Sequence, residues 1–371
     1  MTPSSRSSVR FSARRDYSGA LAFLAAAACS LAATTVADAG QPQKDPWDLK
    51  LFRFEFDNDT FLGSDDAFSA GWSVQVHSAL RDEWVPTYAS WIGKLPGLGD
   101  DGRGGRITRW AYGLSQAIVT PSDITIAEPQ PFDAPWAGIL GVHGSWAAYD
   151  NRRMAAIQLY LGCMGPCAQG DDVQTFIHED LGFGDHPAGW ANQLSNRALA
   201  NVNYEYRYKL LADEPTAYVP GRFAYDLGVG GQAAVGNLAT SLTVQAELRF
   251  GWGMSMGFSK IPDPPGLGTV VEPVYFVPGQ TPADLKRWRT YFNLVGRRTW
   301  YDYFAPAEGG ATESGYDHPE VRPYPLETAA ILGLHLVRVP FGIHLTYYSY
   351  FGGPEREASS DWVNFSFEYR F

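Results

Sequence analysis

Long apolar runs are missing from this sequence beyond its first 40 residues. None of the runs there approaches the roughly 20 apolar residues that a membrane-spanning helix requires, which excludes helical membrane spans. Charged residues are few, at 19% of the chain, and their net charge of −11 excludes a general nucleic-acid binder because neutralising phosphates needs a basic surface. A hydrophobic share of 45% over 371 residues instead predicts a folded protein with a sizeable core.

The first 39 residues have the composition of an export signal. Four arginines precede a small apolar stretch over 20–33, and an Ala-Asp-Ala triplet closes the segment. We therefore predict a cleavable signal peptide over 1–39 and an exported domain over 40–371. Cleavage removes four Arg and two Asp, so the net charge changes from −11 to −13. A twin-arginine signal at Arg14-Arg15 is a less favoured alternative.

Cysteine is scarce, with three residues in the whole chain. Cys29 lies in the predicted signal peptide, where a lipoprotein site is a minor alternative. Cys163 and Cys167 remain, in the order Cys-Met-Gly-Pro-Cys. In an oxidising compartment the alternatives are a local disulfide and an open pair of thiols. A zinc site is disfavoured because no histidine stands at ligand spacing.

The C-terminal residues alternate between apolar and polar side chains. The apolar members are Val363, Phe365, Phe367, Tyr369 and Phe371, and the polar members are Asn364, Ser366, Glu368 and Arg370. This period of two predicts a strand with one apolar face. A soluble sandwich could also contain such a strand, but a terminal aromatic on an exported acidic chain is typical of bacterial outer-membrane β-barrels.

Similar segments of about ten residues recur along the chain, which is the weak signal expected from each strand of a membrane barrel. They lie near 49–57, 67–79, 107–119, 136–149, 152–164, 198–210, 218–234, 240–252, 288–301, 325–338, 341–351 and 361–371. Twelve is an even number, and no linker divides the chain. We predict an all-β fold, a transmembrane antiparallel β-barrel of twelve strands with a short helix in an outer loop.

An even-stranded bacterial barrel has both termini in the periplasm, so the first and fifth strands should end at the cell surface. Two segments on the periplasmic side, 80–106 and 253–287, are then long and rich in Gly and Pro. We interpret them as elaborated inner turns, with a short helix over 84–95. A strand count that is off by one is the alternative.

Oxygen donors cluster at the outward end of the first strand. Arg53, Glu55 and Asp57 should face the lumen, and Asn58 and Asp59 end the strand. Asp65 and Asp66 follow, and Ser69 stands at the beginning of the second strand. Hard oxygen ligands gathered this closely suit Ca²⁺. The alternative is a solvated acidic hairpin tip.

One histidine lies in the long loop after the fifth strand. The run 172–181 has no helix breaker, so a short helix would place Gln174 and His178 on one face at a spacing of four. Histidine is the usual general base near neutral pH. A histidine with no role on the loop surface is the alternative.

Several motifs together resemble a known family. They are FDNDTF (56–61), DDAFSAGW (65–72), LGCMGP (161–166), VQTFIH (173–178), GWANQL (189–194) and AVGNLAT (234–240). Their order is similar to that in the outer-membrane lipid A deacylases of the LpxR type. The resemblance implies a twelve-stranded barrel with its active site at the cell surface, between the barrel wall and an outer-loop helix. It also implies a divalent cation, taken to be Ca²⁺, and a histidine base.

The resemblance assigns roles to individual residues. Asn58 and Asp59 match the family's Asn-Asp pair, His178 matches its base and Gln174 also matches. Ser69 stands where the family has a threonine. Two departures concern substrate recognition: the family lysine after the third strand has no counterpart in 120–131, and His186 replaces a tyrosine.

These observations predict a Ca²⁺-dependent outer-membrane hydrolase that removes an ester-linked acyl chain from lipid A, with another divalent cation as an alternative. Asp59 and Asn58 would bind the metal, His178 would act as the base, and Asn58, Ser69 and Gln174 would complete the catalytic set. The expected partners are lipopolysaccharide, the outer membrane and the barrel-assembly machinery, without nucleic acid. The rival is a non-enzymatic barrel that serves as a narrow channel or an interaction scaffold.

Overall fold

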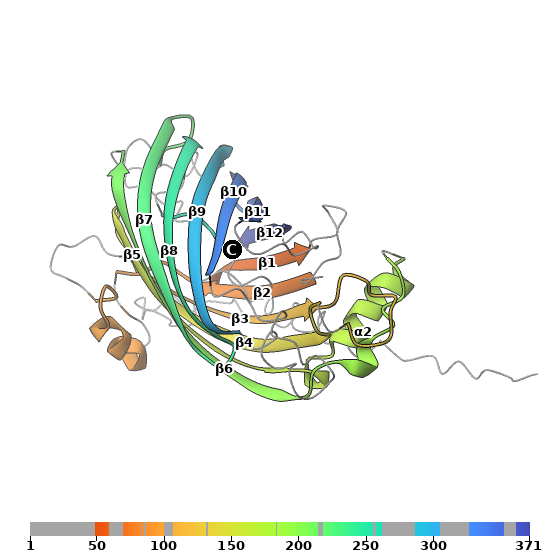
Figure 1. Ribbon diagram of the computed structural model, residues 1–371. Coiled ribbons are helices and arrows are strands. Elements are labelled where there is room, and N and C mark those ends of the chain that lie inside the picture. The colour runs from red at the N-terminus through yellow and green to blue at the C-terminus, as the bar shows by residue number, and fades with distance from the viewer. Residues whose placement is uncertain are drawn as a thin grey trace, which may run out of the picture. The chain divides into compact units, whose positions relative to one another are not determined.

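Alternating apolar and polar residues form twelve strands that close into one antiparallel barrel (Figure 1). The computed structural model describes residues 49–58, 70–82, 84, 87–99, 107–130, 133–182, 184–213, 218–254, 257–261, 286–304, 326–351 and 361–371. The predicted signal peptide lies outside the described residues. No helix within these ranges is long and apolar enough to cross a membrane.

Each strand is hydrogen-bonded to the next along the chain, and β12 closes the barrel on β1. The strands are β1 (Leu49–Asn58), β2 (Ala70–Ser78), β3 (Ile107–Val119), β4 (Ala137–Tyr149), β5 (Arg153–Met164), β6 (Arg197–Ala212), β7 (Phe223–Gly236), β8 (Ala239–Trp252), β9 (Arg289–Phe304), β10 (Leu326–Arg338), β11 (Phe341–Phe351) and β12 (Trp362–Arg370). The predicted twelve strands are confirmed. The seventh was expected from 218, but Gly221 adopts a φ of 85° in a turn and β7 begins after it.

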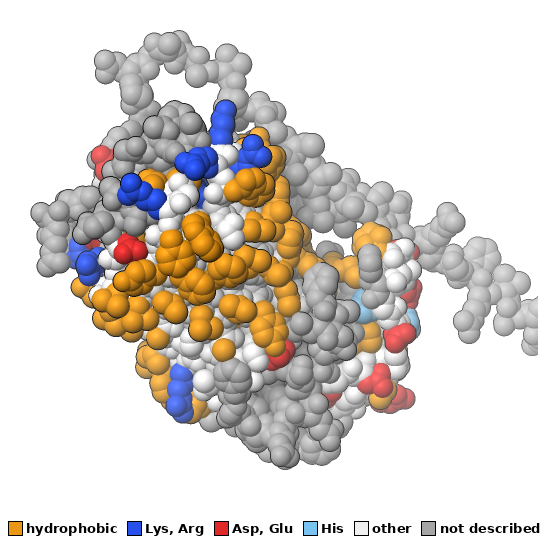
Figure 2. All heavy atoms as spheres, turned by 90° about the horizontal axis from the view of Figure 1, so that it is seen from above, with side chains coloured by type: hydrophobic (Ala, Val, Ile, Leu, Met, Phe, Trp, Pro, Cys, Tyr) orange, Lys and Arg blue, Asp and Glu red, His pale blue; other side chains and the backbone are white. Residues whose placement is uncertain are grey.

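The two faces of the wall differ as predicted. On β12, Asn364 and Glu368 are fully buried in the lumen, whereas Phe365 and Tyr369 are each 37% exposed on the outside. On β1, Arg53 and Glu55 likewise point inward and are buried. Figure 2 shows apolar side chains in a broad band across the visible outer wall, with basic side chains gathered beyond its edge. An apolar outside with a polar inside is the pattern of a membrane barrel.

Paired charges fill much of the lumen. Arg53 Nη2 lies 2.8 Å from Glu368 Oε1, and Lys209 Nζ lies 3.1 Å from Asp226 Oδ2. All four side chains are at most 1% exposed. Buried charges need such partners because an unpaired ion in a water-poor interior is costly.

The segment after β8 folds back into this lumen. Lys260 Nζ contacts Glu55 Oε1 at 2.7 Å, and Arg207 Nη1 donates to the Ser259 carbonyl at 2.7 Å. Ser259 and Lys260 are fully buried. Residues 257–261 therefore occlude part of the barrel interior, although they are far in sequence from β1.

The two ends of the barrel carry different connections. β1 begins and β12 ends at one end, which we name the terminus end, and the other end is the loop end. The turns at 150–152 and 339–340 are short and lie at the terminus end, together with the long segments 79–106 and 253–288. Both long connections thus lie at the end that carries the termini, as predicted, and the strand count is correct. The helix expected over 84–95 is present as a 3₁₀ helix, η2 (Thr87–Lys94).

We predict that the purified protein conducts no steady ionic current in a planar lipid bilayer. The reason is that buried ion pairs and residues 257–261 occupy the lumen. Single-channel recording tests this, with heat-modifiable migration on a detergent gel as the control for an assembled barrel. A stable conductance from assembled protein would contradict it.

Candidate functional site

A short helical segment follows β5 at the loop end. It consists of a 3₁₀ turn, η3 (Pro166–Ala168), a helix, α2 (Gly170–Thr175), and a π-helical turn, η4 (Phe176–Asp180). The helix predicted over 172–181 is confirmed, with its start two residues earlier. Acidic residues in its first turn favour that start because the N-terminal end of a helix attracts negative charge.

This segment packs on the outside of the barrel wall. Gln116, Leu140 and Cys163 lie in one register row across β3, β4 and β5. Leu140 lies two residues before Val142, which is 54% exposed, and Cys163 lies two residues after Leu161, which is 61% exposed. Residues two apart on a strand share a face, so this row faces outward. Figure 1 shows α2 beside the loop ends of β3 and β4.

The helix start touches the wall directly at Gly138 on β4. A Cβ added to Gly138 would lie 3.1 Å from Ala168 Cβ and 3.1 Å from the Gly170 nitrogen. Gly138 shares the outward face with Leu140. The site is therefore built against the lipid-facing surface rather than in the lumen.

The side-chain amide of Gln174 has a hydrogen-bond partner for its oxygen but none for its nitrogen among the described residues. Its side chain is 2% exposed, and Oε1 accepts a hydrogen bond of 2.8 Å from Trp190 Nε1. Trp190 is itself fixed edge-on against Trp136, with ring centroids 5.1 Å apart. Gln174 Nε2 has no hydrogen-bond partner among the described residues. A buried donor without a partner costs about 1–3 kcal/mol, which a bound carbonyl or oxyanion would offset.

The contacts of His178 favour the tautomer that a base requires. Its Nδ1 lies 2.8 Å from the backbone carbonyl oxygen of Asp185. Because a carbonyl can only accept, Nδ1 carries the hydrogen in the neutral ring and Nε2 keeps its lone pair. Gly184 makes this approach possible, since a Cβ there would overlap His178 Nδ1.

Asn58 shares the outer face of the wall with this segment. It ends β1 on the face of Phe52, Phe54 and Phe56, and its register row continues through Ala70 and Ile118 to Gly138. Three strand spacings of about 4.8 Å put Asn58 about 14 Å along the wall from β4. A lipid headgroup could therefore contact both places.

The remaining predicted site residues lie outside the described residues. They are Asp59 and Ser69, together with the neighbouring Asp65 and Asp66. Asp57 is described, but it faces the lumen and accepts a hydrogen bond of 2.7 Å from Asn364 Nδ2. In the part of the chain that is described, no three His, Cys, Asp or Glu side chains gather to hold a metal ion.

The loop after β3 forms the other border of the site. Ala188 donates its N–H to the Ile124 carbonyl at 2.8 Å, and Asn192 Nδ2 donates to the Ala127 carbonyl at 2.7 Å. These bonds tie 120–130 to the loop that carries His178. Within segment 120–130, the hydroxyl and the backbone N–H of Thr125 donate hydrogen bonds to Asp123. These bonds hold the pKa of the Asp123 carboxyl below its ordinary value.

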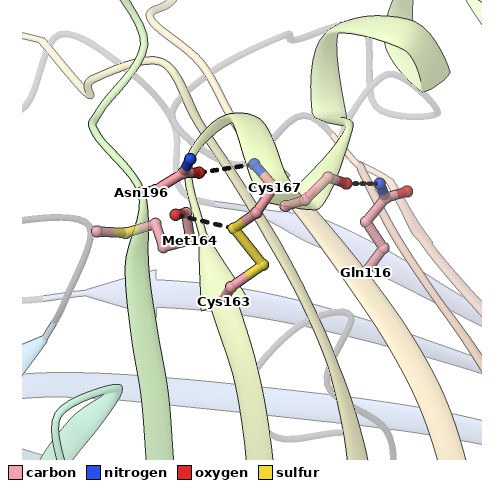
Figure 3. Close-up of a disulfide and its surroundings, with 6 residues drawn as sticks. Gln116, Cys163, Met164, Cys167 and Asn196 are labelled. Atoms are coloured by element: carbon pink, nitrogen blue, oxygen red, sulfur yellow. Dashed lines mark hydrogen bonds between the residues drawn. A yellow bond between two sulfur atoms is a disulfide. The ribbon is translucent and has the colours of Figure 1, made fainter.

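A disulfide joins Cys163 at the end of β5 to Cys167 in η3 (Figure 3), with their Cα atoms 6.3 Å apart. Of the two alternatives drawn from the sequence, the structure has the bonded pair. Asn196 Oδ1 also accepts a hydrogen bond of 2.7 Å from the Cys167 N–H. The turn that leads into α2 is thereby fixed to β5 and to the start of β6.

Sequence reasoning missed three residues that shape the site. Trp190 orients Gln174, the Asp185 carbonyl orients His178, and Gly184 leaves room for that carbonyl. Trp190 lies in the GWANQL motif, which served only to recognise the family. His186, which replaces the expected tyrosine, pairs through Nδ1 with Glu179.

Comparisons with known proteins agree with this fold. A family model described as outer membrane protein LpxR matches residues 21–371. The structure of LpxR from Salmonella typhimurium has a TM-score of 0.65 at 15% identity, covering 86% of this chain and 100% of that chain. At this identity the likeness shows the fold.

Two other solved barrels are less similar. The β domain of the Bordetella autotransporter BrkA has a TM-score of 0.41 at 10% identity, covering 87% of this chain and 99% of that chain. A KdgM porin has a TM-score of 0.33 at 5% identity, covering 86% and 99%. No curated protein sequence matches the chain.

We predict that Gly184→Ala disturbs the His178 ring, because the added Cβ and Nδ1 cannot occupy the same space. In the parent protein, nitrogen NMR of labelled histidine should show His178 protonated at Nδ1 when neutral, and the variant should lose this preference. Gly296→Ala is the matched control, since a Cβ there meets nothing within 4 Å. An unchanged His178 spectrum in Gly184→Ala would rule out the Asp185 contact.

Proposed function

Because the chain belongs to the LpxR family of outer membrane proteins, we propose that it is a lipid A deacylase that hydrolyses an ester-linked acyl chain at the cell-surface side of the membrane. One observation carries the proposal. A histidine with a free Nε2 lone pair and a glutamine with an unpartnered N–H lie on one helical segment, against the outside of the barrel wall. A lipid can reach that place by moving within the membrane, without passing through the lumen.

The residues suggest how the ester bond is cleaved. His178 Nε2 takes a proton from a water molecule, whose oxygen attacks the carbonyl carbon of the ester. The carbonyl oxygen becomes an oxyanion, and the free Gln174 N–H is the donor available to stabilise it. Collapse of this intermediate breaks the bond to the ester oxygen. That oxygen leaves as an alkoxide and takes the proton from the His178 imidazolium.

Asn58 and Asp59 are the residues that would hold Ca²⁺, with Ser69 beside them in the family pattern. Their side chains offer carboxylate and amide oxygens, the hard donors that calcium prefers. Asp57 cannot join them because its side chain lies on the lumen side of β1. When bound, the cation supplies Lewis-acid polarisation of the ester carbonyl.

The charge of the loops also favours a cation-dependent site. The segments 120–136 and 165–196 contain eight Asp and Glu residues and no Lys or Arg. A lipid with anionic phosphates therefore meets like charge here, and like charges repel unless a counter-ion lies between them. The missing family lysine adds to this need, because no other Lys or Arg in these two segments replaces it.

The rival functions fit less well. A narrow channel requires an open lumen, but ion pairs and residues 257–261 occupy it. An interaction scaffold has no need for the Asp185 carbonyl to orient His178. For biogenesis we infer recognition by the barrel-assembly machinery through β12, whose outward face exposes Phe365 and Tyr369.

We predict that His178→Ala abolishes deacylation while the barrel still assembles, because a loop side chain contributes nothing to the strand hydrogen bonds. Loss of a general base typically lowers the rate about 10² to 10⁴-fold. Mass spectrometry of lipid A from expressing cells should show loss of one acyl group with the parent and none with the variant. His186→Ala in the same loop is the control and should keep most activity. Equal processing by assembled His178→Ala would place the base elsewhere.

We also predict that chelation stops the reaction and that added Ca²⁺ restores it. Asp59→Asn should weaken the response to calcium, since it removes one negative charge at nearly constant volume, and high calcium should partly rescue it. Asp57→Asn is the matched control, because Asp57 is buried in the lumen, where it accepts a hydrogen bond from Asn364. Full activity after chelation, or an Asp59→Asn variant with the parent's calcium response, would contradict the metal-assisted mechanism.

A further inference from the structure

One buried amide joins the barrel wall to the segment that carries the proposed base. Gln116 on β3 is 2% exposed although it faces outward, because η3 covers it. Its Nε2 donates to the Ala168 carbonyl at 2.6 Å, and its Oε1 accepts from Trp72 Nε1 at 2.7 Å. Figure 3 shows Gln116 reaching η3 from the side opposite to Asn196.

These two bonds connect separate parts of the site. Trp72 lies on β2, two residues after Ala70, which pairs with Asn58. Ala168 stands two residues before the start of α2, the helix that carries Gln174. A single side chain thus links the strand next to the proposed metal ligands with the turn that leads to the base.

Resting on the proposed function, we infer that Gln116 is a positioning residue of the deacylase site. Its amide sets where α2 lies along the outer wall relative to the β1–β2 end. An amide meets both requirements here, since its N–H donates to the Ala168 carbonyl and its oxygen accepts from Trp72. A carboxylate at this position would accept from Trp72 but would repel the Ala168 carbonyl.

The other described supports of η3 lie toward β4, β5 and β6. The Gly165 N–H donates to the Gly138 carbonyl on β4 at 2.9 Å, and Ala168 lies close against Gly138. The Cys163–Cys167 disulfide and the Asn196 bond fix the turn to β5 and β6. Loss of Gln116 therefore leaves the turn attached at one flank and free to shift at the other. A displacement of about 1 Å of a catalytic group can lower a rate about 10²-fold. The consequence is a change in catalysis without unfolding.

The test compares Gln116→Leu and Gln116→Glu with the parent in the assembled full-length protein. Gln116→Leu removes both bonds at similar size, and Gln116→Glu keeps the acceptor but loses the donor. We expect kcat to fall about 10- to 100-fold in both, with KM within about twofold. Trp72→Phe should lose less, because the bond to Ala168 remains. Gln158→Leu is the control, since Gln158 is a buried lumen glutamine that bonds Asn203 and not the loop.

A second measurement does not depend on activity. Hydrogen exchange of the amides in 166–181 should become faster in Gln116→Leu, while exchange in the strands stays unchanged. The inference is overturned if kcat and loop exchange both match the parent, or if activity falls only in proportion to the fraction of assembled barrel. If the parent shows no deacylation at all, the proposed function fails, and unchanged loop exchange would then also exclude Gln116 as the support of α2.

Discussion

The hydrogen-bonded closure between β1 and β12 is the constraint on which the rest of the structure depends. Backbone N–H and C=O groups cannot be left unpaired in lipid, so a sheet that spans a membrane must have no free edge. Here Asn58 pairs with Val363 and Leu51 with Arg370, from opposite ends of the sequence. Only when that seam is in register do the polar residues of all strands point inward together, because a shift by one residue exchanges the two faces.

Closure also decides where chemistry can occur. The inside is occupied by charges that must pair with one another, such as Arg53 with Glu368 and Lys260 with Glu55. The outside is apolar and faces lipid along most of its height. The loop end of the wall at β3 and β4 differs from this, because η3 and α2 cover it and bring polar groups to it. The site that we propose for a membrane lipid therefore lies where a loop meets the outer wall.

The sequence is informative wherever lipid imposes a local period. Alternation along β1 and β12 predicts which side chains face inward, since the rule involves only neighbours along one strand. The short helix with Gln174 and His178 is also a local feature. By contrast, Lys260 contacts Glu55 across about half the chain, and Gln116 meets a backbone carbonyl 52 residues away. No short-range pattern identifies such partners, because a lone Gln on an outward face has no periodic signature.

This difference between local patterns and long-range contacts also applies to the candidate site. The residue types can be predicted from the sequence, but their orientation cannot. A histidine can be recognised by its residue type, but its tautomer depends on the Asp185 carbonyl, which is oriented only after the loop has folded. That loop has only short helical turns, so the geometry of its internal contacts, Trp190 with Gln174 and Asp185 with His178, also depends on how the loop is attached to the barrel. The rigid barrel supplies this geometry through Gln116 on one flank and through the disulfide and Asn196 on the other. A loop that is fixed at both flanks to a hydrogen-bonded wall, and that packs Trp190 and Leu194 into the hydrophobic cluster beside it, can hold His178 in place.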